Sequence, residues 1–403
     1  MDKLTDASNN LITTATTATD TTAASPSGVT EKPTSRRQFL KGGLLATGGV
    51  AASTIGAPAV LGQSPLVLRM QTSWPSGDIW MDFAQQYVDR VQSMSGGRLQ
   101  IDLLPAGAVV QAFQVMDAVS DGVLDCAHTV AAYWYGKHRA ASLFGTGPVF
   151  GWDGQSFLSW FYQGGGQELY QELTQDMLGL NVYGLYAFPM PAQPFGWFKE
   201  PVTTVEELQG FKYRTVGLAT NVMQALGMSV TQLPGGEIVP AMERGVIDAF
   251  EFNNPSSDLR FGAQDVAKHY ILSSYHQASE TFEILFNRDV MDDLDEDLRA
   301  ILRHAVEAVS TANTASAMHN YSSDLQRLQE EHGVTLHRTS DEILQAQLEA
   351  WTDVIEELEQ DDFNRRVLDS QREWAQRVGF YNIMNGVDQA LAYEHFFPGR
   401  LKL

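Results

Sequence analysis

The sequence is poor in cysteine, in basic residues and in long hydrophobic runs, and each shortage excludes a class of protein. Its 403 residues include one cysteine, Cys126, which excludes an internal disulfide framework and a multi-cysteine zinc site. Only 27 lysines and arginines oppose 49 aspartates and glutamates. The resulting formal charge of −22 argues against nucleic acid as a partner. No stretch of about 20 strongly apolar residues is present, which excludes a polytopic membrane protein.

The sequence also lacks the short motifs of common enzyme classes. It contains no Gly-x-Ser-x-Gly elbow, no His-Glu-x-x-His pair, no phosphate-binding loop and no Rossmann glycine fingerprint. A secreted carbohydrate-active hydrolase is the alternative, with Asp248 and Glu251 as its acidic pair. A spacing of three along a strand directs these side chains to opposite faces, which makes a poor acid–base pair. We therefore predict that the protein is not an enzyme and has no organic cofactor.

Residues 1–62 have the composition of a leader. Residues 1–34 are rich in Thr, Ala and Ser and have too few large apolar side chains to form a core. An arginine pair, Arg36-Arg37, then precedes a weakly apolar run, and the order of these features is that of an export signal. The arginine pair resembles a twin-arginine signal, with a transmembrane anchor as the alternative. We expect cleavage between Ala59 and Gly62 and export to the periplasm. The leader has five basic and four acidic residues, so the rest of the chain carries −23.

The remainder of the chain alternates strand and helix patterns and then becomes almost wholly helical. Alternating apolar residues predict a strand at Leu66–Gln71, and helical spacing predicts a helix directly after it. Such segments alternate to about residue 252, which favours α/β lobes with mainly parallel sheets. Helices are then predicted over Ala300–Glu331, Asp341–Glu359 and Asp361 to about His395.

Two segments far apart in the chain resemble each other. In Ala118–Ala127 and Ala241–Phe250, a helical pattern ends on a glycine and a short strand begins two residues later. The similarity indicates two related lobes that face one cleft, with chance as the alternative. Because the carboxyl ends of strands face the ligand crevice in open α/β sheets, we expect residues 129–135 and 251–254 to lie there.

Isolated polar residues stand at the ends of apolar strand-like segments. They are Gln193, Arg214 and Glu251. An arginine in this place is suited to hold a carboxylate through two parallel hydrogen bonds. A glutamate and an amide oxygen beside it suit a small hard cation. An internal Arg214–Glu251 ion pair, or exposure of both side chains, is the alternative interpretation.

From about Leu66 to the C-terminus, the chain resembles the extracytoplasmic solute-binding proteins of TRAP (tripartite ATP-independent periplasmic) transporters, of the DctP type. Within them it resembles the branch that binds 2-oxo acids and lactate. The order and spacing of several motifs carry the resemblance. These motifs are Leu103–Gly107, Gly122–Asp125, His128–Val130, Tyr133–Lys137, Gly196–Phe198, Leu208–Arg214, Gly235–Ile238 and Gly245–Ala249.

The resemblance implies an α/β, two-lobed periplasmic binding protein fold with a hinge, a long spanning helix and a helical C-terminal tail. It places the leader at 1–62, mainly lobe 1 at 63–190, mainly lobe 2 at 191–288, and the spanning and C-terminal helices at 289–403. In the 2-oxo acid branch the last helix is exchanged between subunits, so a homodimer is implied.

The implied function is capture of a small 2-oxo or 2-hydroxy monocarboxylate, such as pyruvate or lactate, for delivery to the membrane subunits of a TRAP transporter. A ligand-binding sensor or chemotaxis component with the same fold is a further alternative.

The resemblance also implies roles for single residues. Arg214 would grip the substrate carboxylate and Tyr133 would hydrogen-bond to the substrate. Gln193 would contact both the substrate and a bound Na⁺ or Ca²⁺. Glu251 and the backbone carbonyl of Phe252 would be further ligands of that cation.

The chain departs from the branch at three places. Phe252-Asn253-Asn254 replaces an aromatic-Val-Gly stretch, which makes Asn254 a candidate substrate contact in a more polar pocket wall. Pro194 follows Gln193 and changes the local backbone. Gln277 stands where the branch tends to have a glutamate, which weakens one candidate cation ligand.

Overall fold

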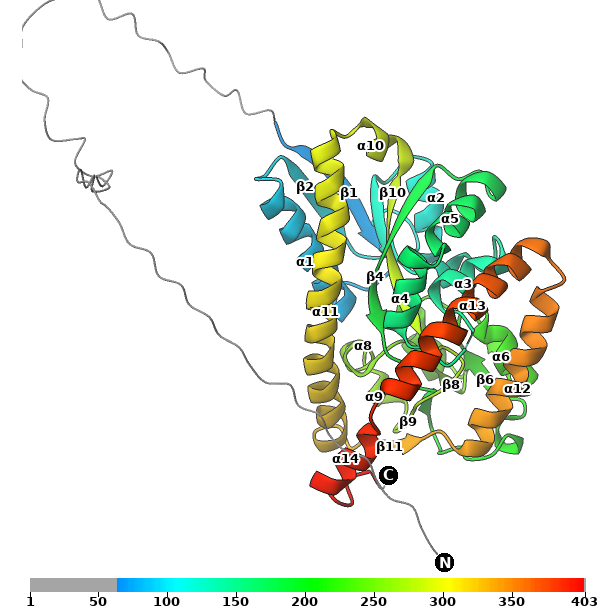
Figure 1. Ribbon diagram of the computed structural model, residues 1–403. Helices are drawn as coiled ribbons and strands as arrows, with labels where there is room; N and C mark the ends of the chain where they lie inside the picture. Colours follow the sequence, from blue (N-terminus) through cyan, green and yellow to red (C-terminus); the bar gives the residue numbers. More distant parts are fainter. Residues whose placement is uncertain (1–63, 149, 402–403) are drawn as a thin grey trace, which may run out of the picture. The chain divides into compact units, whose positions relative to one another are not determined.

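Two β-sheets organise residues 64–148 and 150–401, the part of the chain that the computed structural model describes (Figure 1). The predictions for the leader and the export signal fall outside these residues. The first sheet has the order β2-β1-β3-β10-β4, formed by Leu99–Leu104, Leu66–Thr72, Cys126–Thr129, Glu280–Asn287 and Val182–Met190. The second has the order β11-β9-β5-β8-β6-β7, formed by Thr335–Arg338, His269–Leu272, Gly196–Phe198, Ala249–Phe250, Lys212–Arg214 and Ser229–Thr231. We call the parts built on these sheets lobe 1 and lobe 2.

Helices follow the strands in both lobes, as the alternating pattern predicts. Those of lobe 1 are α1 (Ile79–Met94), α2 (Val115–Ser120), α3 (Ser142–Gly145), α4 (Gly154–Gln163), α5 (Gly166–Gln171) and α10 (Arg288–Asp293). Those between the strands of lobe 2 are α6 (Ala219–Ala225), α7 (Ile238–Glu243), α8 (Pro255–Phe261) and α9 (Ala263–Val266). The C-terminal helices are α11 (Glu296–Glu330), α12 (Asp341–Leu358), α13 (Asp362–Asn385) and α14 (Gln389–Phe396). None of the described helices is both long enough and apolar enough to span a bilayer.

Both sheets are mainly parallel, as predicted, and each contains one strand that runs against all the others. In lobe 1, β10 runs antiparallel to β3 and β4. In lobe 2, β5 runs antiparallel to β8 and β9. These strands follow two crossing segments between the lobes, at 191–195 and 273–279; helix α11 later carries the chain back to β11 of lobe 2. After each of the two crossing segments the chain enters the new sheet from the interlobe side, so its first strand runs against its neighbours.

The lobes share a helix–glycine–strand unit, as the repeat predicts. Gly122 and Gly245 end α2 and α7 in the left-handed conformation, with φ of 72° and 68°. In each case the next residue's backbone N–H donates to a carbonyl in the helix, at 2.9 Å in both lobes. Glycine adopts this conformation without the steric cost of a Cβ.

An aspartate in the same unit ties the strand to its neighbour. Asp125 Oδ2 accepts from the backbone N–H of Arg69 in β1, at 2.6 Å. Asp248 Oδ2 accepts from the backbone N–H of Lys212 in β6, at 3.2 Å. The two aspartates therefore align β3 beside β1 and β8 beside β6, and each strand delivers its carboxyl end toward the other lobe.

Helix α11 is the predicted spanning helix. Its 35 residues give it a length of roughly 52 Å. It packs against α1 and β4 of lobe 1 and against α8, which follows the β8 strand of lobe 2 (Figure 1). It begins at Glu296, four residues before the predicted start.

The predicted last helix consists of two helices, because Gly386 ends α13 and the chain restarts as α14 at Gln389. Up to Gly379, α13 buries side chains such as Phe363, Val367 and Leu368 against its own chain. Residues 380–401, which we call the C-terminal tail, expose their large apolar side chains instead. Phe380, Tyr381, Ile383, Met384, Val387, Leu391, Tyr393, Phe396, Phe397 and Leu401 are all between 45% and 74% exposed.

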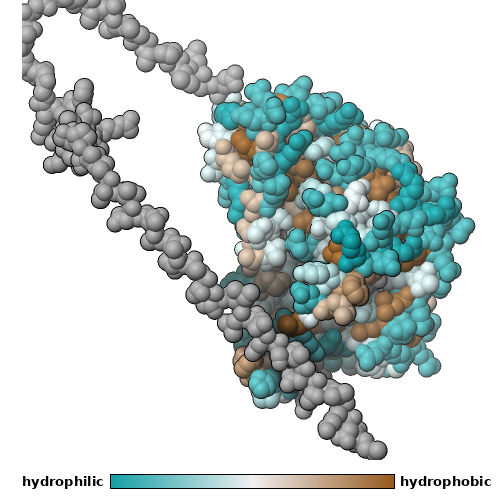
Figure 2. Space-filling view, in the orientation of Figure 1, coloured by the Kyte–Doolittle hydropathy of each residue, from teal (hydrophilic) through white to brown (hydrophobic). Residues whose placement is uncertain are grey.

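Hydrophilic residues cover most of the visible face in Figure 2, and the hydrophobic ones lie in small separate groups. The described ion pairs, with one exception, have exposed or half-exposed side chains. The exception is Arg214–Glu251, in which both side chains are 1% exposed.

A second buried acid, Glu283, lies in the middle of β10, whose eight residues are all buried. Its carboxylate accepts hydrogen bonds from Trp134 Nε1 at 2.9 Å and from the Tyr170 hydroxyl at 2.5 Å. Burial raises the pKa of Glu283 from 4.5 to about 7, and the two donors only partly oppose this rise.

We predict that Glu283→Gln stabilises the protein increasingly as the pH rises from 4.5 to 7. Over this range the native state keeps the Glu283 proton while the unfolded chain loses it, so the wild type loses stability with rising pH. The difference between variant and wild type should grow toward about 3 kcal/mol. Denaturant unfolding at several pH values measures it. Glu168→Gln, at an exposed position in α5, is the matched control. A pH-independent difference for Glu283→Gln would contradict the prediction.

Candidate functional site

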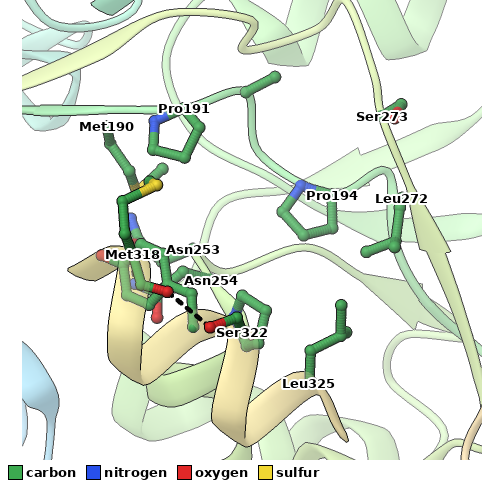
Figure 3. Close-up of a pocket in the computed structure, with 13 residues that line it drawn as sticks. Met190, Pro191, Pro194, Asn253, Asn254, Leu272, Ser273, Met318, Ser322 and Leu325 are labelled. Carbon is green, nitrogen blue, oxygen red and sulfur yellow. Dashed lines mark hydrogen bonds between the residues drawn. The ribbon is translucent and has the colours of Figure 1, made fainter. Parts of the chain in front are cut away.

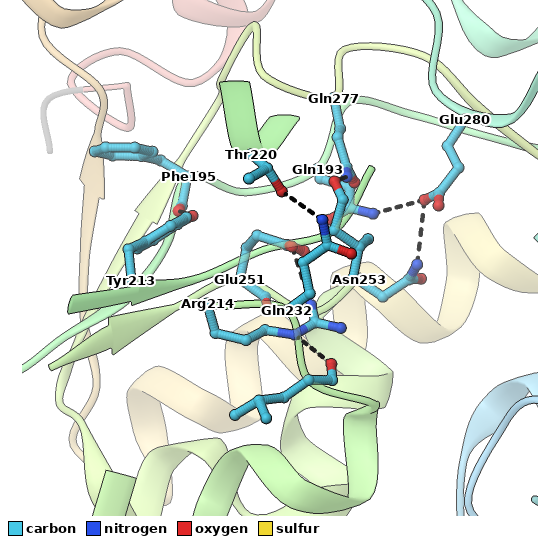
Figure 4. A network of polar contacts seen from close by, with 12 residues as sticks. Gln193, Phe195, Tyr213, Arg214, Thr220, Gln232, Glu251, Asn253, Gln277 and Glu280 are labelled. Atoms are coloured by element: carbon cyan, nitrogen blue, oxygen red, sulfur yellow. Dashed lines mark hydrogen bonds and ion pairs between the residues drawn. The ribbon is translucent and has the colours of Figure 1, made fainter. Parts of the chain in front are cut away.

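Arg214, the last residue of β6, lies in the interior between the lobes (Figure 4). Its Nε donates to the carbonyl of Leu233 at 2.8 Å. Its Nη1 donates to the backbone carbonyl of Glu251 at 2.8 Å and to Glu251 Oε1 at 3.0 Å. Among the described residues, Nη2 has no hydrogen-bond partner. The internal ion pair that the sequence left open is therefore present, and one donor nitrogen of the guanidinium remains available.

Glu251 directly follows β8, and its backbone N–H donates to the carbonyl of Arg214 at 3.2 Å. The parallel pairing of β6 and β8 thus places the two side chains side by side. Burial raises the pKa of Glu251 from 4.5 to about 7, while Arg214 lowers it. Glu251 Oε2 has no partner within the described part of the chain.

Gln193 and Gln277 lie on the two crossing segments. The backbone N–H of Gln193 donates to the carbonyl of Gln277 at 3.0 Å, which joins the crossings to each other. The side-chain oxygens of both glutamines are buried and have no hydrogen-bond partner in the residues that the structure describes. In Figure 4 a dashed line joins the Gln193 side chain to Glu280, which is also joined to Asn253.

Glu280 is the site residue that sequence reasoning missed. It is 3% exposed, and its Oε2 accepts from Gln193 Nε2 at 2.7 Å and from Asn253 Nδ2 at 3.2 Å. Burial raises its pKa to about 8, and the nearby Glu251 carboxylate adds to the rise. A signal was present, since Glu280 opens an otherwise apolar run in which only Glu283 is also charged.

The two asparagines after Phe252 make different contacts. Asn254, predicted as a substrate contact, is the N-cap of α8, and its side-chain oxygen accepts from two backbone N–H groups of that helix. Asn253 faces the network instead. Its side-chain oxygen accepts from Trp80 Nε1 of lobe 1 at 2.9 Å. Asn253 therefore links the site in lobe 2 to helix α1.

Tyr133 reaches the site from lobe 1, on the short helix Ala131–Trp134. Its ring packs against Trp74 and Phe113, with centroids 5.9 and 4.6 Å away. Burial raises the pKa of Tyr133 well above its usual value. The positive charge of Arg214 opposes this rise, and the negative charge of the Glu280 carboxylate adds to it. The hydroxyl thus lies within electrostatic reach of the network.

Phe252 forms one wall of the site. Its ring lies 5.6 Å from the guanidinium carbon of Arg214 and packs onto Gly235. A Cβ at Gly235 would meet the Phe252 ring at 2.4 Å, so this close approach requires glycine.

The oxygen donors of the network suit a hard cation. Within the described residues, no three His, Cys, Asp or Glu side chains cluster as a metal site. The buried oxygens without partners belong to Gln193, Gln277 and Glu251. Amide, carboxylate and carbonyl oxygens are the ligands that Ca²⁺ prefers, and they suit Na⁺ as another hard cation. Burial raises the pKa of both Glu251 and Glu280, and a cation beside them would favour their charged forms.

Two cavities border the network. A pocket of about 250 Å³ lies between the lobes, lined by Ser73, Pro75, Ala106, Gln111 and Ala112 of lobe 1 and by Pro234–Glu237 of lobe 2. The second, of about 400 Å³, lies on the α11 side and is lined by both crossing segments and α11 (Figure 3). Asn253 lines this larger hinge pocket and also hydrogen-bonds to Glu280, so it separates the pocket from the network. The larger pocket is mostly apolar and contains no charged side chain.

Two α/β lobes, joined by two crossing segments and by the spanning helix α11 and enclosing a buried polar network, are the architecture of a bacterial solute-binding protein. The chain belongs to the DctP family, because the model of that family, described as bacterial extracellular solute-binding protein, family 7, matches residues 70–361.

One relative is a monocarboxylate 2-oxoacid-binding periplasmic protein of Nostoc sp., 34% identical over 331 residues. That alignment covers 81% of this chain and 88% of the relative.

Two solved structures show the kind of ligand that similar proteins hold. A TRAP transporter solute-binding protein from Bordetella bronchiseptica has a TM-score of 0.76 and 25% identity, covering 83% of this chain and 98% of that one. It is a mixed-occupancy dimer with copurified calcium and picolinate. A TRAP periplasmic solute-binding protein from Pseudoalteromonas atlantica, with bound sodium and pyruvate, has a TM-score of 0.75 and 28% identity. The match covers 83% of this chain and 99% of that one.

Proposed function

We propose that this protein is the periplasmic solute-binding component of a TRAP transporter and captures a small 2-oxo or 2-hydroxy monocarboxylate, such as pyruvate or lactate, together with Na⁺ or Ca²⁺. The observation that carries the proposal is the guanidinium of Arg214, which is buried between the lobes with Nη2 free of partners in the described chain. A buried donor of this kind is costly unless a ligand satisfies it. The names of the relatives support the class of acid.

The atoms without hydrogen-bond partners indicate which residues would bind the acid and which would bind the cation. The ligand carboxylate would bind Nη2 of Arg214. The cation would be held by the side-chain oxygens of Gln193, Glu251 and Gln277, which have no partner in the described chain, and by the Phe252 carbonyl. Glu280 adds a second carboxylate beside Gln193. A 2-oxo or 2-hydroxy oxygen next to the carboxylate lets the ligand contact the guanidinium and the cation at once.

The two lobes contribute different groups. Lobe 2 and the crossing segments supply the charged and amide groups, while lobe 1 supplies the Tyr133 hydroxyl for a hydrogen bond to the ligand. Because the folded part of the chain carries a large negative charge, an acid gains no long-range attraction, and recognition depends on this local set. Closure of the lobes would bury the acid for delivery to the membrane subunits of the transporter. Export by the twin-arginine signal at residues 35–62 completes the proposal.

We predict that Arg214→Ala weakens pyruvate binding by about 2–5 kcal/mol, because a buried carboxylate loses its charged hydrogen-bond partner. Calorimetry with Ca²⁺ present measures the affinity. Arg214→Lys keeps the charge but lacks the planar fork, so we expect an intermediate loss. Arg244→Ala, at an exposed position after α7, is the control. Unchanged affinity in a folded Arg214→Ala variant would remove Arg214 from the site.

We predict that the cation and the acid bind cooperatively. Pyruvate should raise the melting temperature of the wild type more with Ca²⁺ or Na⁺ than after chelation and desalting, by mass action. Glu251→Gln and Glu280→Gln should each reduce this cation-dependent gain, because each removes a negative charge beside the cation. Glu243→Gln, exposed at the end of α7, should leave it unchanged. A thermal-shift screen of small organic acids, run with and without the cation, measures this gain. Equal shifts in melting temperature under the two conditions would exclude the cation from the site.

We also propose that the C-terminal tail, residues 380–401, forms a homodimer by packing on a second copy of the chain. Exposed side chains such as Phe380, Ile383 and Leu391 form a longer apolar surface than a monomer normally leaves in water. The Bordetella bronchiseptica protein is described as a dimer, which is consistent with a dimer here.

A chain that ends at Gly379 should therefore be a monomer by light scattering, while the chain from residue 63 to the C-terminus is a dimer. A cut at Asp361 would be less informative, because residues 363–379 pack against their own chain. Val246→Ser, which removes an exposed apolar side chain outside the tail, should remain a dimer. A dimer that survives the truncation at Gly379 would disprove the role of the tail.

A further inference from the structure

A pocket of about 220 Å³ lies in lobe 1, and three arginines line it. Arg288 comes from α10, and Arg299 and Arg303 come from the first turns of α11. Gln171, Gln175, Tyr183, Met291 and Asp292 complete the lining. We call it the arginine pocket. Figure 1 shows α5, α10 and the start of α11 at the same end of lobe 1.

We propose that the arginine pocket is a second ligand site, which binds a small polyvalent oxyanion such as phosphate or a tricarboxylate. Three guanidiniums face one acidic side chain, Asp292, in a protein whose formal charge is −22. Guanidinium groups offer paired N–H donors that match carboxylate and phosphate oxygens. The amide of Gln171 and the hydroxyl of Tyr183 add uncharged donors to the same wall.

The acidic residues around the pocket do not neutralise all three arginines through ion pairs. Asp289 accepts from Asn181 Nδ2, and Asp297 pairs with Arg98 on the other side. Asp292 lies 3.6 Å from Arg288 Nε, a long contact between two exposed side chains. In the described part of the chain, Arg299 and Arg303 form no ion pair, although Asp295 precedes Arg299 by one helical turn and Glu307 follows Arg303 by one.

The walls of the pocket are held in place by other contacts. The guanidinium carbon of Arg303 lies over the Tyr183 ring, 5.7 Å from its centroid. Gln175 Nε2 donates to the carbonyl of Val182 at 2.8 Å, and the backbone N–H of Arg288 donates to the carbonyl of Asn181 at 3.1 Å. An anion would therefore meet a charged wall whose arrangement is partly fixed before binding, which lowers the entropy lost on binding.

The arginine pocket is separate from the solute site. It shares no lining residue with either cavity that borders Arg214. Along α11, Arg303 precedes Met318, the first α11 residue of the hinge pocket, by roughly 22 Å. Anion binding at the arginine pocket is therefore independent of the proposed function at Arg214.

Calorimetric titration of inorganic phosphate and of citrate into the chain from residue 63 onward, at low ionic strength and saturating pyruvate, tests the proposal. Both anions should bind the wild type with one site per chain. The double variant Arg299→Gln/Arg303→Gln should bind about tenfold more weakly for each guanidinium removed. Pyruvate affinity of this variant should equal that of the wild type, which shows that the fold and the solute site are intact.

The control is Arg244→Gln/Arg338→Gln, which removes the same two charges at exposed positions outside the pocket. It should bind phosphate and citrate as the wild type does. Equal weakening in both double variants would mean that only the overall charge matters and would overturn the proposal. So would a wild type that binds neither anion, or one that binds a hexaglutamate peptide but no free anion, since the surface would then dock a protein. Failure of pyruvate to bind would instead count against the proposed function at Arg214.

Discussion

The buried guanidinium of Arg214 is the constraint on which the site depends. A charge that is removed from water must be matched by hydrogen bonds and by an opposite charge nearby. Here the carbonyl of Leu233, the carbonyl of Glu251 and the Glu251 carboxylate provide that match. All three belong to lobe 2, so this lobe can hold the charge whether or not lobe 1 lies against it.

Glu251 and Glu280 extend the same balance across the crossing segments. Each is buried, and burial raises the pKa of both carboxyl groups. Gln193 lies between them, with its amide nitrogen bonded to Glu280 and its oxygen without a partner in the described chain. The proposed ligands, a chelating acid and a hard cation, would give Arg214 Nη2 an anionic acceptor and give the unpartnered oxygens a positive charge.

Much of this arrangement was predictable from the sequence, because Gln193, Arg214 and Glu251 are polar residues at the ends of apolar strand-like segments. The paired glycines at 122 and 245 likewise revealed the related units of the two lobes. Other features depend on contacts between distant segments. Glu280 joins the site through a residue 87 positions away, and Trp80 reaches Asn253 across 173 positions. The mainly parallel sheets were predicted, but the reversed strands β5 and β10 were not, because periodicity does not show from which side the chain enters a sheet.

The two crossings also determine the order in which the lobes can be completed. Strand β10 lies inside the first sheet, between β3 and β4, yet it follows every strand of the second sheet except β11. The edge strand β11 in turn follows α11, long after the rest of its sheet. During synthesis neither sheet is complete until the other is almost finished, and pairing over such separations slows folding. For the same reason, no single cut in the polypeptide yields an intact lobe.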